Sequence, residues 1–266
     1  MTIYFLGGGN MASAIIAGLQ RQLFSHTIHV ANRGAAKREA LAAQFGISVS
    51  EKLPELHADD VLILAVKPQD MQTACADVQT NGALIISLAA GISIATLSRY
   101  LSGNTRIIRA MPNTPAQIGL GIAGLFAPAH LSDADKTIAH AIFSASCHTI
   151  WLDNEAQIHA ITAISGSGSG YVFYLMNTLQ QAAQNFGFAP QQARELSIQT
   201  FKGAVALAEQ TGEDLATLQN KVTSKGGTTA AALDVFRLHQ IAEHLCDGTQ
   251  AAAKRSQELA NLFEAQ

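Results

Sequence analysis

The chain has 266 residues, of which 48% are hydrophobic and 14% are charged, and its formal net charge is −3. That length allows one large domain or two smaller ones, each with a substantial buried core. The charge argues against nucleic acid as the main partner, because no basic block is present to neutralise phosphates.

Neither the start of the chain nor its apolar windows indicate export or a membrane. Residues 2–12 follow Met1 without the basic region and cleavage pattern of a signal peptide. The windows 61–66 and 82–97 are too short or too interrupted to span a bilayer. Three widely spaced cysteines predict neither a disulfide framework nor a metal site. We therefore expect a cytoplasmic protein with no metal and no membrane contact.

The first half of the chain alternates helix-like and strand-like segments. Helical spacing occurs at residues 10–24, 34–45, 69–79 and 132–145. Short apolar runs lie around these segments, at residues 3–6, 28–31, 61–66, 84–87, 106–110 and roughly 121–127. The alternation predicts a parallel sheet, and the nearly unbroken apolar runs predict helices on both of its faces.

The second half reads as helical. The strand signal ends with residues 149–153, and helices are predicted at 155–186, 190–210, 213–221 and 239–264. The sequence therefore predicts an α/β domain over residues 1–153 and an all-α domain over residues 154–266. The small side chains of the helical domain would let its helices pack closely against a second copy of the chain. A monomeric bundle is the alternative.

A glycine-rich segment joins the first predicted strand to the first predicted helix. Within GGGNMA (7–12), Gly7, Gly9 and Ala12 fill a G-x-G-x-x-A pattern. The first glycine allows a tight turn, the second lets a pyrophosphate approach the backbone, and the third small residue brings the helix close to the strand. This predicts a Rossmann-like dinucleotide site, against the alternative of a tight turn without a ligand. Its predicted binding residues are Gly7, Gly8, Gly9, Asn10 and Met11.

The end of the second strand indicates which dinucleotide binds. Asn32 and Arg33 stand where an NAD site usually places an acid for the ribose hydroxyls. Arg33 can pair with a 2′-phosphate, which an acid would repel. Lys37 or Arg38 could help, although we expect both on a solvated helix face. We therefore predict NADPH as the cofactor, with NADH as a weaker donor.

Two further loops follow predicted strands at the edge where a cofactor would lie. They are AVKPQ (65–69) and SLAAGIS (87–93), and each alone could be a plain strand–helix turn. Together with the glycine-rich segment they predict the walls of one cleft. The predicted cofactor-binding residues here are Ala65, Val66, Lys67, Pro68, Ala89, Ala90 and Gly91.

The run VTSKGGTTAAALD (222–234) sits in an otherwise alanine-rich helical region. Glycine is costly inside a helix and threonine is only a fair helix former, so helix stability does not explain the run. A turn between two helices is one explanation, although a single glycine would suffice for that turn. This run and six earlier segments resemble segments of the pyrroline-5-carboxylate reductase family and follow the same order along the chain. The six are GGGNMA (7–12), ANR (31–33), AVKPQ (65–69), AAGIS (89–93), RAMPNTPA (109–116) and ISGSGSGYVF (164–173).

The resemblance implies a substrate site at this run, which is the family's most specific signature. In the family a helix begins there and holds the substrate carboxylate, and glycine-exposed N–H groups suit that anion. Thr229 would be catalytic, hydrogen-bonding near the imine nitrogen either to orient the ring or to help deliver a proton. The substrate-binding residues carried over are Ser224, Gly226, Gly227, Thr228, Thr229, Glu155 and Glu209, the two glutamates being also explicable as surface helix residues.

The resemblance also implies that Met111 contacts the nicotinamide and that Asn113 makes polar contacts in the cofactor cleft. The alternative is that the segment MPNTP (111–115) is only a proline-rich connection after a strand. Two departures stand out. Ser169 and Gly170 replace the usual Pro and Ala, and Lys225 stands where Pro is frequent. Neither departure removes a residue with a chemical role.

We thus interpret the chain as an NADPH-dependent reductase of 1-pyrroline-5-carboxylate to L-proline, acting as a homodimer or larger homo-oligomer through its helical domain. One alternative is a related NADP-dependent imine or hydroxyacid oxidoreductase. The absence of lysine from residues 154–186 counts against a β-hydroxyacid dehydrogenase, which would use a lysine there. The other alternative is a non-enzymatic redox sensor that binds NADP(H).

Overall fold

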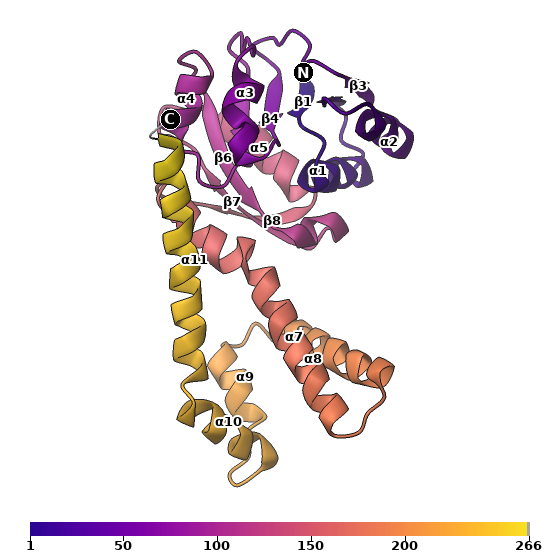
Figure 1. Ribbon diagram of the computed structural model, residues 1–266, viewed down its shortest axis with the longest axis vertical. Coiled ribbons are helices and arrows are strands. Elements are labelled where there is room, and N and C mark those ends of the chain that lie inside the picture. Colours follow the sequence, from indigo (N-terminus) through magenta and orange to yellow (C-terminus); the bar gives the residue numbers. More distant parts are fainter. Residues whose placement is uncertain (265–266) are drawn as a thin grey trace. The chain divides into compact units, whose positions relative to one another are not determined.

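The computed structural model describes residues 1–264 (Figure 1). The chain divides into two compact units, Met1–Ser167 with Ala251–Gln266, and Gly168–Gln250. The α/β and all-α character predicted for the two halves is confirmed. The helical segments α6 (Gln157–Ile161) and η3 (Thr162–Gly166) pack against strands of the first unit. The first division between compact units therefore falls after Ser167, later than the predicted boundary at residue 153. The roles predicted for residues 1–153 and 154–266 stay predictions.

An eight-stranded sheet forms the centre of the first unit, in the order β3-β2-β1-β4-β5-β6-β7-β8. Strands β3 through β6 in that order are parallel, whereas β7 runs antiparallel to β6 and parallel to β8. The strands are β1 (Thr2–Leu6), β2 (Thr27–Ala31), β3 (Ser48–Ser50), β4 (Val61–Leu64), β5 (Leu84–Ser87), β6 (Ile107–Pro112), β7 (Gly121–Phe126) and β8 (Cys147–Trp151).

Helices cover both faces of this sheet, as the sequence predicts (Figure 1). Alternate strand residues point to opposite faces: in β4, Ile63 joins one buried cluster and Leu62 the other. The first cluster includes residues of α1 (Asn10–Arg21), α2 (Ala35–Phe45) and α5 (Asp133–Ser144). The second includes residues of α3 (Met71–Cys75) and α4 (Ile94–Tyr100), with Phe263 near the end of α11 (Ile241–Glu264) packed against it.

The structure differs from the sequence prediction in three elements of this unit. Strand β3 and helix α4 were not predicted, and β7 was expected to be parallel. Only the short segment η2 (Thr114–Ile118) lies between β6 and β7. A parallel neighbour needs a crossover of a dozen or more residues, so a connection this short returns the chain antiparallel.

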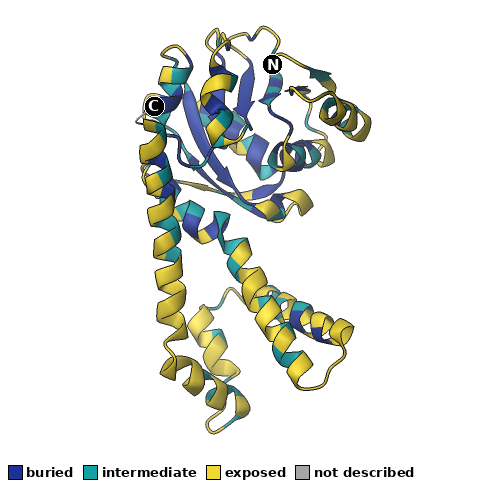
Figure 2. Ribbon diagram, viewed as in Figure 1, coloured by how far each residue is buried: buried dark blue, intermediate teal, exposed yellow. Residues whose placement is uncertain are grey.

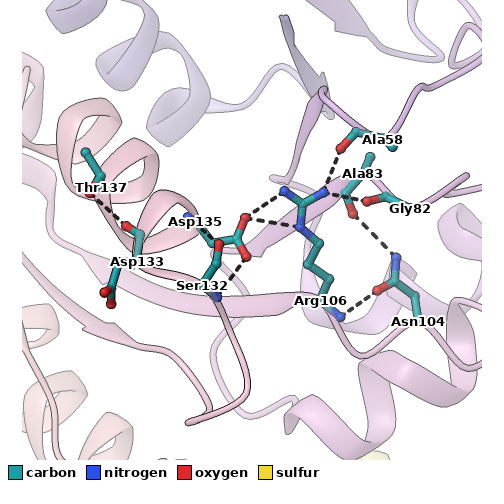
Figure 3. Close-up of polar contacts among 9 residues, drawn as sticks. All are labelled: Ala58, Gly82, Ala83, Asn104, Arg106, Ser132, Asp133, Asp135 and Thr137. Carbon is teal, nitrogen blue, oxygen red and sulfur yellow. Dashed lines mark hydrogen bonds and ion pairs between the residues drawn. The ribbon is translucent and has the colours of Figure 1, made fainter.

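An ion pair ties together the amino-terminal ends of several elements (Figure 3). Arg106 donates through Nη2 to Asp135 Oδ1 at 2.7 Å and through Nη1 to the carbonyls of Ala58 and Gly82, each at 2.6 Å. Asp135 also forms a capping box with Ser132 at the start of α5. Burial would raise the pKa of Asp135, but the hydrogen bonds from Arg106 and Ser132 hold it below its usual value.

A hollow of about 490 Å³ opens beside Arg106. Because the Arg106 guanidinium is already bound by Asp135 and two carbonyls, this hollow offers a ligand little free positive charge.

The second unit consists of helices and exposes many large apolar side chains. It contains α7 (Gly168–Asn185), α8 (Pro190–Thr211), α9 (Leu215–Lys221), α10 (Thr228–Leu238) and the first turns of α11. Helices α7 and α8 pack together, and Ser197 Oγ donates to the Met176 carbonyl at 2.7 Å. Figure 2 shows these helices as mostly exposed. Large apolar residues that are more than half exposed include Phe173, Tyr174, Val205, Leu215, Phe236 and Leu238.

Across the described part of the chain, no helix combines the length and the apolar character needed to cross a membrane.

Candidate cofactor and substrate site

The predicted cofactor loops lie along one edge of the sheet. The parallel strands β1, β2, β4 and β5 all end at this edge, and the loops that follow them start at residues 7, 32, 65 and 88. The strand order reverses between β1 and β4, which are neighbours in the sheet. Ligands of doubly wound sheets bind in the crevice at such a switch point, outside the carboxyl ends of the strands.

The glycine loop leaves space that the chain itself does not fill. Gly7 has φ +100°, and a Cβ there would lie 2.9 Å from the Ala65 carbonyl oxygen, so the turn itself requires this glycine. Gly9 has φ −70° and ψ −178°, which any residue adopts. A Cβ on Gly9 would meet nothing nearer than Ala65 O at 4.0 Å. No side chain caps α1, so its first N–H groups and the bare Gly9 fit the pyrophosphate of a dinucleotide.

The loop after β2 is held in shape from within. Gly8 N donates to Asn32 Oδ1 at 3.2 Å, which joins this loop to the glycine loop. Arg38 Nη1 donates to the carbonyls of Asn32 at 2.7 Å and Arg33 at 2.8 Å. The expected solvated position of Arg38 is therefore wrong, because its guanidinium is occupied by these carbonyls. Arg33 itself is exposed, which leaves its guanidinium open to a 2′-phosphate.

The loops after β4 and β5 are short and contain small residues. Lys67 is exposed and directly precedes the 3-10 turn η1 (Pro68–Asp70), with no capping hydrogen bond from its side chain. After β5, Ala89 N donates to Ser87 Oγ at 3.3 Å, and Gly91 has φ +73°. The loop after β5 therefore offers little side-chain bulk beside the crevice, whereas the loop after β4 carries the exposed Lys67.

The segment that ends β6 packs inside the protein. Met111 is buried, and Asn113 is 9% exposed. Asn113 Nδ2 donates to the Ser165 carbonyl at 3.2 Å, and its Oδ1 accepts from Ile122 N at 2.9 Å. Ser165 lies in η3, a π-helix of the kind that often marks functional sites. The amide of Asn113 thus uses one donor and one acceptor within the chain, and its predicted contacts with a cofactor stay a prediction.

In the second unit, the run at residues 224–229 forms an uncapped helix start. Helix α10 begins at Thr228 after Gly227, and no side chain caps it. Gly226 has φ +72°, and Gly227 N donates to the Ser224 carbonyl at 3.0 Å. The positive φ favours glycine at position 226, whereas Gly227 has an extended backbone and a Cβ there would displace the Ser224 hydroxyl. The N–H groups of the first turn, with the Thr228 and Thr229 hydroxyls, can bind one carboxylate.

Comparisons with known proteins match both halves of the chain. The family model for pyrroline-5-carboxylate reductase dimerisation matches residues 155–259, and the one for NADP oxidoreductase, coenzyme F420-dependent, matches residues 2–91. The chain is 40% identical over 266 residues to the pyrroline-5-carboxylate reductase of Haemophilus influenzae, covering 98% of both chains. This chain belongs to the pyrroline-5-carboxylate reductase family.

Other members show the same extent of similarity. The pyrroline-5-carboxylate reductase of Pseudomonas aeruginosa is 40% identical over 263 residues, which cover 97% of this chain and 96% of that protein. The solved structure of a pyrroline-5-carboxylate reductase from Coxiella burnetii is 34% identical with a TM-score of 0.87, over 97% of this chain and 98% of that one. The predicted family is therefore confirmed over nearly the whole length.

The two glutamates carried over from the family differ in their surroundings. Glu209 is exposed on α8. Glu155 Oε1 accepts from Arg109 Nη1 at 3.0 Å and from Ile94 N, at the start of α4, at 2.7 Å. Oε1 of Glu155 is therefore engaged within the protein, and the predicted role of this residue in substrate binding stays a prediction. The pair was not predicted from the sequence, although Arg109 within the apolar run RIIRA (106–110) was a signal for it.

The buried Arg109 also shapes the environment of His159. Burial lowers the pKa of Arg109, while the charge of Glu155 and the hydrogen bond to it oppose that shift. Burial lowers the pKa of His159 as well, and the positive charge of Arg109 lowers it further, whereas Glu155 and Glu264 raise it. His159 Nδ1 shares a 2.8 Å hydrogen bond with Ser256 Oγ. The fold therefore favours a neutral His159.

Acidification is expected to destabilise this protein partly through His159. Its pKa in the fold lies below the value of 6.5 for the free side chain, so the unfolded chain takes up the proton first. The stability due to the neutral ring is complete above pH 6.5 and is lost as the pH falls through the folded pKa. Urea unfolding at about pH 7.5 and about pH 5.5 should show a smaller loss for His159→Gln than for the parent. An equal loss in both would contradict this assignment, and the exposed His148→Gln is the control.

Proposed function

We propose that this protein reduces 1-pyrroline-5-carboxylate to L-proline, with NADPH as the hydride donor and NADH as a weaker one. One observation carries the proposal. The glycine-opened, uncapped start of α10, with Thr228 and Thr229 in its first turn, lies in a chain that belongs to the pyrroline-5-carboxylate reductase family. That turn suits the carboxylate of a small substrate.

The residues of the glycine loop fit a bound dinucleotide. Gly9 leaves open space beside the uncapped start of α1, and Arg33 is exposed at the end of β2. NADPH, when bound, supplies a hydride from C4 of its nicotinamide. In this proposal the amide groups at Gly9 and Asn10 bind the pyrophosphate, and Arg33 binds the 2′-phosphate. Arg38, through the carbonyls of residues 32 and 33, fixes the backbone that carries Arg33.

The residues of the α10 turn would bind and orient the substrate. The free N–H groups and the hydroxyls of Ser224 and Thr228 bind the carboxylate, and Thr229 hydrogen-bonds near the imine nitrogen. A protonated C=N bond accepts hydride far better than a neutral one, so a substrate bound as iminium requires no separate general acid. The protein's contribution is then proximity and orientation, worth about 7–11 kcal/mol in well-aligned systems.

We propose further that the protein works in the cytoplasm as a homodimer or larger homo-oligomer. In this scheme residues 1–153 bind the cofactor, and residues 154–266 bind the substrate and form the subunit interface. The large exposed apolar side chains of α7 to α10 support this assembly, since soluble monomers rarely leave such surfaces uncovered. The family model for the dimerisation region covers the same helices.

Replacing Thr229 by alanine is expected to lower kcat/KM for 1-pyrroline-5-carboxylate about 10- to 100-fold, because a hydrogen bond to a charged group is lost. The measurement is the loss of NADPH absorbance after adding the substrate, with NADH compared in parallel. Affinity for NADPH should not change in this variant. Thr211→Ala, an exposed threonine at the end of α8, is the matched control. Tight NADPH binding without turnover in the parent chain would instead favour a redox sensor or another substrate.

A further inference from the structure

The last turns of α11 press on the loop that follows β5. A Cβ placed on Gly91 would lie 3.2 Å from Leu259 Cβ and 3.3 Å from Ala260 N. Ala260 is buried, so the helix backbone and this loop are in close contact. Gly91 therefore has no side chain partly because α11 occupies the space that the side chain would need. Residues from Ala251 onward belong to the same compact unit as this loop.

Helix α4, which directly follows the loop, anchors the end of α11. Arg99 Nη2 donates to the Glu264 carbonyl at 3.2 Å, and Tyr100 OH donates to the Phe263 carbonyl at 3.4 Å. These donors satisfy carbonyl groups that a helix end leaves without partners. Further back on α11, Ser256 Oγ bonds His159 of α6 at 2.8 Å. The side chain of Phe263 adds apolar contact with the core beneath α4.

A second group holds the same loop from its other end. Glu155 accepts a hydrogen bond from Ile94 N, the residue at which α4 begins, and is itself paired with Arg109. Ser93, the last residue of the loop, caps α4 by accepting from Thr96 N. Residues 89–93 are thus fixed between the end of α11 and the start of α4.

We propose that the end of α11, from Ser256 to Glu264, is a positioning element that holds residues 89–93 in the form that receives the cofactor. This rests on the proposed function, in which Ala89, Ala90 and Gly91 line the cofactor site. A loop held in its binding conformation loses less conformational entropy when a ligand binds, so its affinity is higher. The end of α11 touches the loop from the side of Leu259 and Ala260, so its effect on the cofactor is through the loop.

Two variants test this role. A chain ending after Leu262 lacks Phe263 and the Glu264 carbonyl, and should bind NADPH about 10-fold more weakly in a fluorescence titration. The double variant Tyr100→Phe with Ser256→Ala removes two hydrogen bonds with little change in volume, and should weaken binding about 3-fold. In both, KM for NADPH should rise while kcat at saturating NADPH changes less than about twofold. Gln257→Ala, exposed on the same part of α11, is the control and should match the parent.

The results separate this proposal from the proposed function. If the parent chain does not bind NADPH, the cofactor assignment fails. If the parent binds NADPH and the double variant, folded as judged by its unfolding curve, binds it equally well, the positioning role of α11 is overturned. The double variant decides the matter even where the shortened chain does not fold. A fall in kcat with an unchanged KM for NADPH also overturns the proposal, because it would place the effect after cofactor binding.

Discussion

A Gly9→Ala variant is expected to fold like the parent chain and to bind NADPH at least about 100-fold more weakly. The backbone at Gly9 suits any residue, and an added methyl group would meet only Ala65 O, at 4.0 Å. The methyl would instead stand where the pyrophosphate approaches the start of α1. Loss of two charge-assisted hydrogen bonds, each worth about 1.5–3 kcal/mol, corresponds to that change in affinity. A fluorescence titration with NADPH, together with urea unfolding, measures both parts.

Gly7→Ala provides the contrast. Gly7 has a φ of +100°, and an added Cβ would lie 2.9 Å from Ala65 O, so alanine at this position would strain the folded protein itself. This variant should lose about 1–3 kcal/mol of unfolding free energy from backbone strain alone, as well as cofactor affinity. The assignment of Gly9 to the pyrophosphate fails if Gly9→Ala binds NADPH as the parent does, or if it loses stability as Gly7→Ala does.

Removing the carboxylate of Glu155 is expected to cost about 3 kcal/mol of unfolding free energy. Glu155→Ala leaves Arg109, whose side chain is 4% exposed, as a buried charge without its partner. It also removes the oxygen that accepts from Ile94 N at the start of α4. Because the Glu155 side chain is 32% exposed, we take the low end of the range known for broken buried pairs. Urea unfolding gives the value directly.

Two comparisons make this result specific. Replacing the pair together, as Arg109→Met with Glu155→Leu, should restore much of the loss, because no unpaired charge is left. Glu51→Ala, which breaks the 4.0 Å pair between the exposed Glu51 and Arg38, should change the unfolding free energy by less than about 1 kcal/mol. A Glu155→Ala chain of unchanged stability but lower affinity for the substrate would instead support the role carried over from the family.

Periodicity and turn chemistry were enough to predict most of the fold. The apolar runs at 3–6 and 61–66 correspond to β1 and β4, and the break predicted between residues 186 and 190 separates α7 from α8. The glycine pattern placed the crevice because strand, turn and helix follow one another within a few residues. All of these signals are local in sequence.

The features that were missed depend on contacts distant in sequence. Strand β3 is short and lies at the sheet edge, so it has little apolar pattern of its own. Asn113 and Glu155 lie in or beside segments that resemble the family, yet Asn113 is taken up by Ser165 and Glu155 by Arg109. A sequence motif does not distinguish a side chain that contacts a ligand from one that holds the neighbouring backbone. The predicted binding roles of all the site residues, Asn113 and Glu155 included, stay predictions.

The most direct test of the proposed reduction follows the transferred hydride. The parent chain is given 1-pyrroline-5-carboxylate and NADPH that carries deuterium at both C4 positions, and the product is analysed by mass spectrometry and NMR. We predict L-proline with one deuterium on the ring carbon that was double-bonded to nitrogen, formed much more slowly by Gly9→Ala at an NADPH concentration near the Kd of the parent. Oxidation of NADPH without deuterated proline, or no oxidation by a chain that binds NADPH tightly, would contradict the account.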